Sequence, residues 1–261
     1  MSGHPLEPYL ARPMTPPGAE ALKAVESGAL QPDQALALDE LDRLLDPGDP
    51  AGAPGWCTLP DGCGYVSIDT PMPGVTGEMV DWWFDWHPRE PIRYRIWHPR
   101  AHVSNAVEMP HTAGAKAHWG TVHHPVEDVG IGMVRARIGF LAPSAMGFSS
   151  DALEDARVAT IVCGYVGDDT RRMRHTAMAH VFLADGDGVL LRSRFWLGAA
   201  MRPYAPGPLA AAGERLLNRP GIRSRVLPRR LPQALSRHCA EEYANLAALL
   251  GELYGRFGPD A

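Results

Sequence analysis

The sequence of 261 residues lacks the features that mark several large protein classes. No apolar run approaches the length that spans a bilayer, and the first residues lack the basic-then-apolar pattern of a secretory signal. The formal net charge is −5, with no basic stripe carrying interleaved aromatic residues, which argues against nucleic-acid binding. A P-loop, a G-x-S-x-G elbow and a G-x-G-x-x-G motif before a helix are also absent. The common nucleotide-binding and serine-hydrolase signatures are therefore missing.

Cysteine is scarce and is not arranged for metal binding. The four cysteines, none in a C-x-x-C spacing, are Cys57, Cys63, Cys163 and Cys239. Few, scattered cysteines are typical of a protein that keeps its thiols reduced, so we expect a cytoplasmic protein. Hydrophobic residues make up 45% of the chain and charged residues 21%, as in ordinary globular proteins with a proper core.

The composition changes along the chain. Residues 1–60 are rich in proline and glycine and contain one predicted helical passage, "PDQALALDELDRLLDPG", ended by Asp-Pro-Gly. We interpret them as a mostly helical N-terminal extension, and residues 61–261 as the main domain. Within the latter, "TGEMVDWWFDW" predicts a short helix from about Thr76 to Trp86.

From Arg93 to Gly198 the hydrophobic pattern has a period of two, which predicts strands. The runs are "RYRIW", "MVRARIGFL", "ARVATIVCGYV" and "TAMAHVFLADGDGVLLRSRFWLG", the last a hairpin with "DGDG" as its turn. A long helix then follows from about Leu231 to Tyr254. This order predicts an α+β fold in which an antiparallel sheet curls around the C-terminal helix.

The C-terminal helix carries a glutamate where an apolar residue is expected. Glu242 falls within its leucine stripe, His238 lies one turn earlier at its edge, and Glu241 points off to one side. A buried carboxylate is costly unless a cation or hydrogen bonds compensate it. Because residues four apart on a helix are neighbours, His238 and Glu242 can reach one metal ion.

Further histidines and a carboxylate are candidates for the same site. "YRIWHPRAHVSN" carries His98 and His102, where Pro99 is expected to end a strand and leave both histidines at its mouth. "HWGTVHHPVEDVG" carries His118, His123, His124 and Glu127; in extended chain His123 and Glu127 share a face.

His180 alternates with Met178 and Phe182 and so faces the same apolar side. Each histidine taken singly is more often a core or surface residue than a ligand. Two histidines and two carboxylates together suit zinc, which can lower the pKa of bound water to about 7 and polarise a carbonyl.

Four stretches resemble a known family, the 2,4-diacetylphloroglucinol hydrolases and the related phloretin hydrolases. They are "GYVSIDTPMPGVTGEMVDWWFDWH", "RYRIWHPRAH", "RSRFWLG" and "HCAEEYANLAALLGELY", spread over most of the chain from about Gly64 onward. The resemblance implies a helix-grip (Bet v 1-like) fold, usually a homodimer, and a zinc-dependent hydrolase that cleaves a carbon–carbon bond.

The resemblance also implies site residues. Two histidines and two glutamates hold zinc in that family, and they fall on His102, Glu127, His238 and Glu242. His98 is the rival of His102. A phenol-binding tyrosine and asparagine fall on Tyr94 and Asn105, and a further catalytic histidine falls on His180.

One position departs from the family pattern. A second phenol-contacting tyrosine is replaced by Phe195, which removes a hydroxyl from the expected substrate site. The main hypothesis is hydrolysis of an acylated phenol or related β-dicarbonyl that releases a carboxylic acid. The alternatives are a helix-grip protein that only binds an apolar ligand, and a polyketide-type cyclase that uses the same cavity.

Overall fold

A computed structural model describes residues 3–26, 30–46, 48, 51–109, 115–205 and 207–259. Within these ranges eight strands form one antiparallel sheet in the order β1-β2-β8-β7-β6-β5-β4-β3. The strands are β1 (Gly55–Thr58), β2 (Gly64–Met72), β3 (His102–Glu108), β4 (Val122–Asp128), β5 (Met133–Leu141), β6 (Val158–Asp168), β7 (Met173–Asp185) and β8 (Gly188–Pro203). From β3 to β8 each strand pairs with the next in the chain, and β2 closes against β8.

Helices precede β1, occupy the connections from β2 to β3 and from β5 to β6, and form the C-terminal end of the chain after β8. The α-helices are α1 (Glu7–Leu10), α2 (Ala19–Glu26), α3 (Gly77–Trp86), α4 (Pro91–Trp97), α5 (Pro143–Met146), α6 (Ser150–Leu153), α7 (Gly207–Leu217), α8 (Pro220–Val226) and α9 (Leu231–Phe257). The 3₁₀ helices are η1 (Pro32–Gln34), η2 (Leu41–Leu45) and η3 (His87–Arg89).

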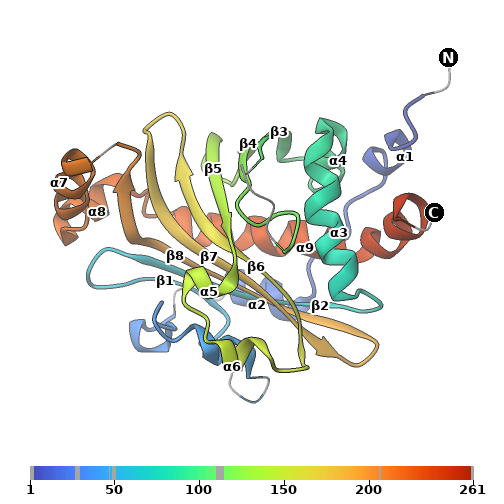
Figure 1. Cartoon of the computed structure of the whole chain (residues 1–261), viewed down its shortest axis with the longest axis horizontal. Coiled ribbons are helices and arrows are strands. Elements are labelled where there is room, and N and C mark those ends of the chain that lie inside the picture. Colours follow the sequence, from blue (N-terminus) through green and yellow to red (C-terminus); the bar gives the residue numbers. More distant parts are fainter. Residues whose placement is uncertain are drawn as a thin grey trace.

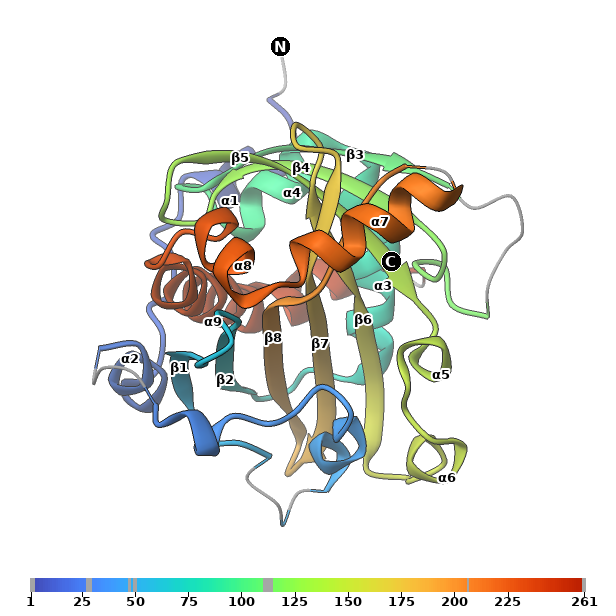
Figure 2. The ribbon, with the colours of Figure 1, turned by 90° about the vertical axis from the view of Figure 1, so that its left-hand side faces the viewer.

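The sheet bends around α9, which runs along its concave side (Figure 1). Turned by 90°, the view shows β6, β7 and β8 side by side, with β5, β4 and β3 curving over the helix (Figure 2). Helices α3 and α4 lie between β2 and β3 in the chain and close one end of this layer. The fold is therefore α+β, as the sequence pattern predicts, and of the helix-grip (Bet v 1-like) type that the family resemblance implies.

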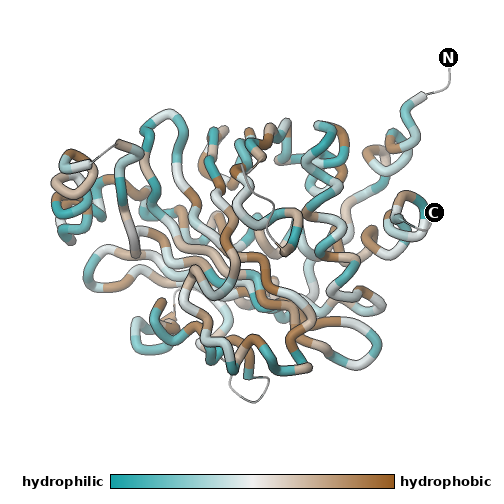
Figure 3. The backbone as a smooth tube through the Cα atoms, viewed as in Figure 1, coloured by the Kyte–Doolittle hydropathy of each residue, from teal (hydrophilic) through white to brown (hydrophobic). Residues whose placement is uncertain are grey.

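The apolar stripe of α9 fills the space inside the sheet. Leu246, Leu250 and Leu253 are at most 1% exposed and belong to one core with Trp83 of α3 and Phe182 of β7. Figure 3 shows hydrophobic stretches along the middle of the sheet, where this core lies. Burial of this stripe, rather than intrinsic helix propensity, stabilises a helix of this length in a protein.

The N-terminal residues from Leu36 to Leu45 cover the outer face of the sheet, whereas α1 and α2 pack against the core on the side of α9. Leu41, Leu44 and Leu45 of η2 pack with Cys163 and Trp196 on the face opposite α9. The single helix predicted over 32–48 is wrong: two short 3₁₀ segments replace it, because the leucines follow the surface of the sheet rather than a helical stripe. Pro47 of the predicted stop signal lies outside the described residues. The domain boundary at residue 60 stays a prediction.

Most other predicted elements are confirmed. The helix near 76–86, the strands over 133–141 and 156–166, the hairpin with its "DGDG" turn and the C-terminal helix all form. The strand predicted at "RYRIW" is wrong, because this run is helix α4. Five residues are too few to separate the two periods, and Pro91 suits the first turn of a helix.

Strand β2 does not show an alternating pattern. Eight of its nine residues are buried or half-buried, because α9 covers one face and the N-terminal residues cover the other. A strand that is buried on both faces has a continuous run of buried residues, so a search for alternating hydrophobic and polar residues does not detect it.

Leu250→Ala is expected to lower the free energy of unfolding by about 2–5 kcal/mol, because it opens a cavity in a fully buried part of α9. Urea unfolding followed by circular dichroism measures the change. Leu209→Ala on α7, where the leucine is 73% exposed, is the matched control and should shift stability by less than about 0.5 kcal/mol. Equal effects of the two changes would contradict the packing described here.

Candidate metal centre and cavity

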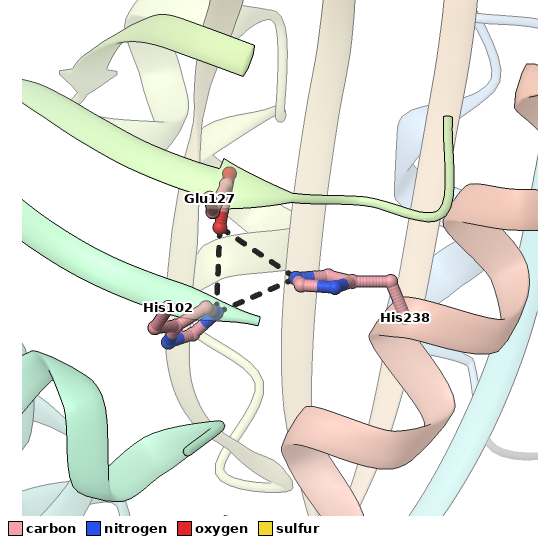
Figure 4. Close-up of side chains that lie close together, drawn as sticks. All are labelled: His102, Glu127 and His238. Carbon is pink, nitrogen blue, oxygen red and sulfur yellow. Dashed lines mark hydrogen bonds and ion pairs between the residues drawn. The ribbon is translucent and has the colours of Figure 1, made fainter. Parts of the chain in front are cut away.

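Three elements bring the four predicted metal ligands together. His102 begins β3 and lies directly opposite Glu127 of β4, while His238 and Glu242 lie one turn apart on α9. Figure 4 shows His102, Glu127 and His238 pointing toward one another from the two strands and the helix. All four residues are at most 9% exposed.

The ligand atoms surround one point. The Nε2 atom of His102 is 3.3 Å from Glu127 Oε2, 3.4 Å from His238 Nε2 and 3.6 Å from Glu242 Oε2. His238 Nε2 is 3.6 Å from Glu127 Oε2 and 3.8 Å from Glu242 Oε2. His102, Glu127 and His238 form a group able to hold a metal ion, with Glu242 placed to be a fourth ligand.

A break in the strand register positions His102. The pairing of β3 with β4 shifts between His102 and Ser104, so one extra residue is accommodated there, and Val103 is 48% exposed. Without this bulge His102 and Asn105, three residues apart, would face opposite sides of the sheet. With it, both are buried on the inner face.

Two contacts fix the orientation of His102. Its Nδ1 donates to the carbonyl oxygen of Tyr94 at 3.1 Å, and its ring stacks on the Tyr94 ring with a centroid distance of 4.0 Å. Because the hydrogen lies on Nδ1, Nε2 carries a free lone pair, which is directed at the other three predicted ligands. A backbone carbonyl that holds the distal nitrogen is the usual support of a metal-binding histidine.

His98, the rival of His102, lies beside the group rather than in it. Its ring stacks on His238 at 5.0 Å, while its Nε2 is 3.3 Å from the carboxylate of Glu241. Glu241 also accepts a bond from Arg100 at 3.2 Å and remains partly exposed. The structure thus separates the two neighbouring glutamates of α9, one facing the buried group and one facing the surface.

The pKa values show how poorly the charges of the group are compensated. Burial raises the pKa of Glu242 to about 8. Burial would also raise the pKa of Glu127, but hydrogen bonds from His238 and Tyr94 and the nearby histidines lower it to about 2. Burial would lower the pKa of His238, but Glu127 and Glu242 raise it to about 9. The pKa of His102 falls well below its ordinary value, chiefly through burial. A dication would neutralise the two carboxylates and remove this imbalance.

The other predicted site residues line a cavity of about 230 Å³ next to the group. The Tyr94 hydroxyl donates to Glu127 Oε2 at 2.5 Å, and His180 Nδ1 is 2.8 Å from the Ser193 hydroxyl. Phe195 packs edge-on against His180 with a centroid distance of 5.4 Å. Tyr94, Asn105, His180, Phe195, Glu127, His238 and Glu242 all contribute to the lining.

Two buried histidines of the lining, His87 and His123, carry no role in the sequence-based assignment. His87 ends the run "WWFDWH" and is 1% exposed, and His123, considered only as a partner of Glu127 on one strand face, is 3% exposed. His123 and Glu127 share the inner face of β4, as predicted. His87 follows Trp83 by four residues at the end of helix α3, which carries an aromatic stripe. That spacing could have indicated from the sequence that His87 is buried beside the cavity.

Fold and site together define a helix-grip protein with a buried histidine and carboxylate centre that adjoins a largely apolar cavity. A model of the DAPG hydrolase PhiG domain family matches residues 36–255 of the chain. The chain therefore belongs to the DAPG hydrolase family, as the sequence motifs indicate, and is an enzyme of the hydrolase class.

Named relatives cover most of the chain. It is 32% identical to the phloretin hydrolase of Eubacterium ramulus, over 94% of this chain and 88% of the relative. It is 30% identical to the 2,4-diacetylphloroglucinol hydrolase of Pseudomonas protegens, over 92% of this chain and 81% of the relative.

Solved structures are similar only at a distance. Ara h 8.0201 is 12% identical with a TM-score of 0.33, over 68% of this chain and 97% of that one. A major latex-like protein from Panax ginseng is 13% identical with a TM-score of 0.35, over 64% of this chain and 99% of that one. Scores this low add nothing to the fold described above from its own strands and helices. In the part of the chain that the structure describes, no helix combines the length and apolarity that crossing a membrane requires.

Glu242→Gln is expected to reduce bound metal from about one ion per chain to well below that value, since the change removes one charged ligand while preserving side-chain volume. Elemental analysis of protein purified without added metal measures this. Glu241→Gln is the matched control on the adjacent residue and should retain the metal. Full metal content in Glu242→Gln would contradict the assignment of Glu242.

Proposed function

We propose that this chain is a zinc-dependent hydrolase that cleaves the bond between a ring carbon and the acyl carbon of an acylated phenol, and releases a carboxylic acid. The observation that carries the proposal is the direct contact between the buried His/Glu group and a cavity lined by Tyr94, Asn105 and His180. The names of the relatives, which describe hydrolases of phloretin and 2,4-diacetylphloroglucinol, support the class of substrate.

Zinc suits the donor set. Nitrogen and oxygen ligands at about 2.0–2.1 Å from a tetrahedral zinc ion lie about 3.3–3.4 Å from one another. The five separations given above for the four residues run from 3.3 to 3.8 Å. Two neutral imidazoles and two carboxylates also balance the charge of a divalent cation. His102, Glu127, His238 and Glu242 would hold the ion.

The reaction adds one water across the carbon–carbon bond. The acyl carbon gains the hydroxyl group and becomes a carboxylic acid, while the ring carbon keeps the bonding electron pair and gains a proton. Bound zinc would supply Lewis-acid polarisation of the acyl carbonyl and a lowered pKa of water. Tyr94 and Asn105 would hold hydroxyl groups of the ring so that the acyl carbon faces the zinc ligands.

His180 is the proposed proton donor to the ring carbon. The sequence-based argument used its ordinary pKa near 6.5, which is wrong for the folded protein, because burial lowers it to about 3. The ring is therefore neutral near pH 7. With the Ser193 hydroxyl donating to Nδ1, the hydrogen of His180 lies on Nε2, from which a proton would pass to the ring carbon. The water consumed in the reaction gives its hydroxyl to the acyl carbon and its remaining proton back to Nε2.

Release of a carboxylic acid distinguishes hydrolysis from the alternatives. Incubation of the zinc-loaded protein with acylphloroglucinols should yield one acid and one deacylated ring per substrate, measured by liquid chromatography. Phe195 offers no hydroxyl to the substrate, so substrates with fewer ring hydroxyls belong in the same screen. Binding without acid release would favour the ligand-binding alternative, and a cyclised product without acid would favour the cyclase.

Tyr94→Phe is expected to lower kcat/KM by roughly two- to tenfold, the effect of losing one hydrogen bond to a neutral ring hydroxyl. Zinc content should stay near one per chain, since all four ligands remain. Tyr9→Phe is the control, because the Tyr9 hydroxyl also donates to a carboxylate, that of Glu252, at 2.8 Å, but outside the cavity. Loss of zinc from Tyr94→Phe would contradict a substrate-binding role.

A homodimer and a cytoplasmic location, both expected from the sequence, stay predictions. Light scattering of the purified protein measures the first.

A further inference from the structure

The cavity continues along α9 beyond the metal centre. Leu235 and Leu231 precede His238 by one and two turns on the same face of the helix, and both line the cavity. At 1.5 Å per residue, the lining extends about 10 Å along the helix axis from His238 toward the N-terminal end of α9. The neighbouring strand extends the lining in step, because Val129 follows Glu127 by two residues and also lines the cavity.

The two ends of the cavity differ in chemistry. Toward the C-terminal part of α9 the lining is mainly aromatic, with Phe84, Trp97, Phe140 and Tyr243. Toward its N-terminal end it is formed by branched aliphatic side chains, which we call the aliphatic arm: Val129, Ile131, Leu227, Leu231 and Leu235. Arg171 also lines the cavity, but its side chain is 57% exposed, which places it at the rim. The aliphatic arm therefore suits an apolar group with no hydrogen bonds to satisfy.

The aliphatic arm ends at a thin wall. Helix α8 lies at the N-terminal end of α9 (Figure 2), and a second hollow of about 550 Å³ lies between α8 and the β1–β2 turn. The residues that line both the cavity and this hollow are Leu197, Leu227, Pro228 and Leu231. Ser224 and Arg229 of the hollow are exposed, so it lies at the surface. A single layer of side chains thus separates the arm from the surface hollow.

Contacts on both sides hold Leu227 in this wall. The carbonyl of the preceding residue, Val226, accepts a hydrogen bond from Nη1 of Arg171 at 3.1 Å. On the side of the sheet, Leu227 packs on Gly198 of β8, where an added Cβ would lie 3.0 Å from Leu227 Cδ1. Gly198 has a φ of +82°, a conformation that favours glycine. The backbone of β8 therefore leaves room for Leu227 to close the arm.

We propose that the aliphatic arm takes the acyl chain of the substrate, and that Leu227 is the specificity-determining residue that limits the length of this chain. With the acyl carbonyl at the metal centre and the ring toward the aromatic end, the arm is the part of the cavity left for the chain. Its length of about 10 Å along α9 suits a chain of several carbons. The inference rests on the proposed function and names its substrate class: phenols whose acyl group carries an extended apolar chain.

The test is the dependence of binding on chain length. Calorimetry measures the affinity of zinc-loaded protein for 4-alkylresorcinols from ethyl to decyl, which have no carbonyl group and so are not hydrolysed. In wild type the affinity should rise about three- to fourfold per methylene group until the chain meets Leu227, and then stop rising. In Leu227→Ala the rise should continue to longer chains, because the arm then opens into the surface hollow. An affinity independent of chain length in wild type, or the same limit in both proteins, would overturn the proposal.

A second variant moves the limit in the opposite direction. Ile131→Phe, in the turn between β4 and β5, adds volume to the aliphatic arm and should shift the limit to shorter chains. It also serves if Leu227→Ala fails to fold, and an unchanged limit in Ile131→Phe would then contradict the role of the arm. The matched control is Leu216→Ala on α7, since Leu216 is 50% exposed and lines neither hollow. A shifted limit in Leu216→Ala would indicate an indirect effect through α7 and overturn the role of Leu227.

Failure of this inference is distinguishable from failure of the proposed function. Acid release from acylphloroglucinols, together with no effect of chain length on binding, would leave the hydrolase standing and remove the role of the arm. A Leu227-dependent length limit for alkylresorcinols, without acid release from any acylphloroglucinol, would keep the role of Leu227 in recognition and remove the hydrolase.

Discussion

The fold brings together two buried carboxylates and two buried imidazoles where α9 meets the β3–β4 hairpin, and much of the structure serves that contact. Four ionisable groups with ligand atoms 3.3 to 3.8 Å apart are costly to bury unless a cation balances them. The raised pKa of Glu242 and the lowered pKa of Glu127 are two results of the same imbalance. The curved sheet, the bulge after His102 and the Tyr94 carbonyl each fix one part of the arrangement. A metal ion bound there would join the helix to the hairpin and so contribute to stability as well as to chemistry.

The bulge in β3 connects the metal site to substrate recognition. Strand geometry alternates sides strictly, so His102 and Asn105 can share a face only if one extra residue is inserted between them. The exposed Val103 shows where the insertion falls. The hairpin consequently carries two successive polar pairs on its inner face, His102 with Glu127 and Asn105 with His123. In the proposed function the first pair would hold the zinc ion and Asn105 of the second pair would hold a ring hydroxyl, at a spacing set by the backbone.

The sequence predicts those parts of the molecule whose signal is local. The leucine stripe of α9 and the misplaced Glu242 predict a buried helix with a charged group, and the long β7–β8 hairpin has both alternation and a turn motif. The run "RYRIW" fails because five residues with apolar side chains at Tyr94, Ile96 and Trp97 fit a strand and a short helix alike. Strand β2 was not predicted, because both its faces are covered and its sequence does not alternate between hydrophobic and polar residues. The membership of His102 in the group and the position of His98 beside it depend on packing between elements distant in sequence, which no local pattern encodes.

The histidines illustrate why residue type alone is a weak guide to role. His102, His238, His123, His180 and His118 are all buried, yet their surroundings give them different chemistry. The Tyr94 carbonyl makes His102 a lone-pair donor at Nε2, and Asn105 makes His123 a hydrogen donor at the same atom. His180 is tied to a serine hydroxyl, while His118 packs between aromatic rings outside the cavity. What each ring can do is decided by the partner of its other nitrogen, so the tautomer is the property that the fold selects. A substitution that preserves the ring but changes that partner would therefore alter function as surely as removal of the histidine.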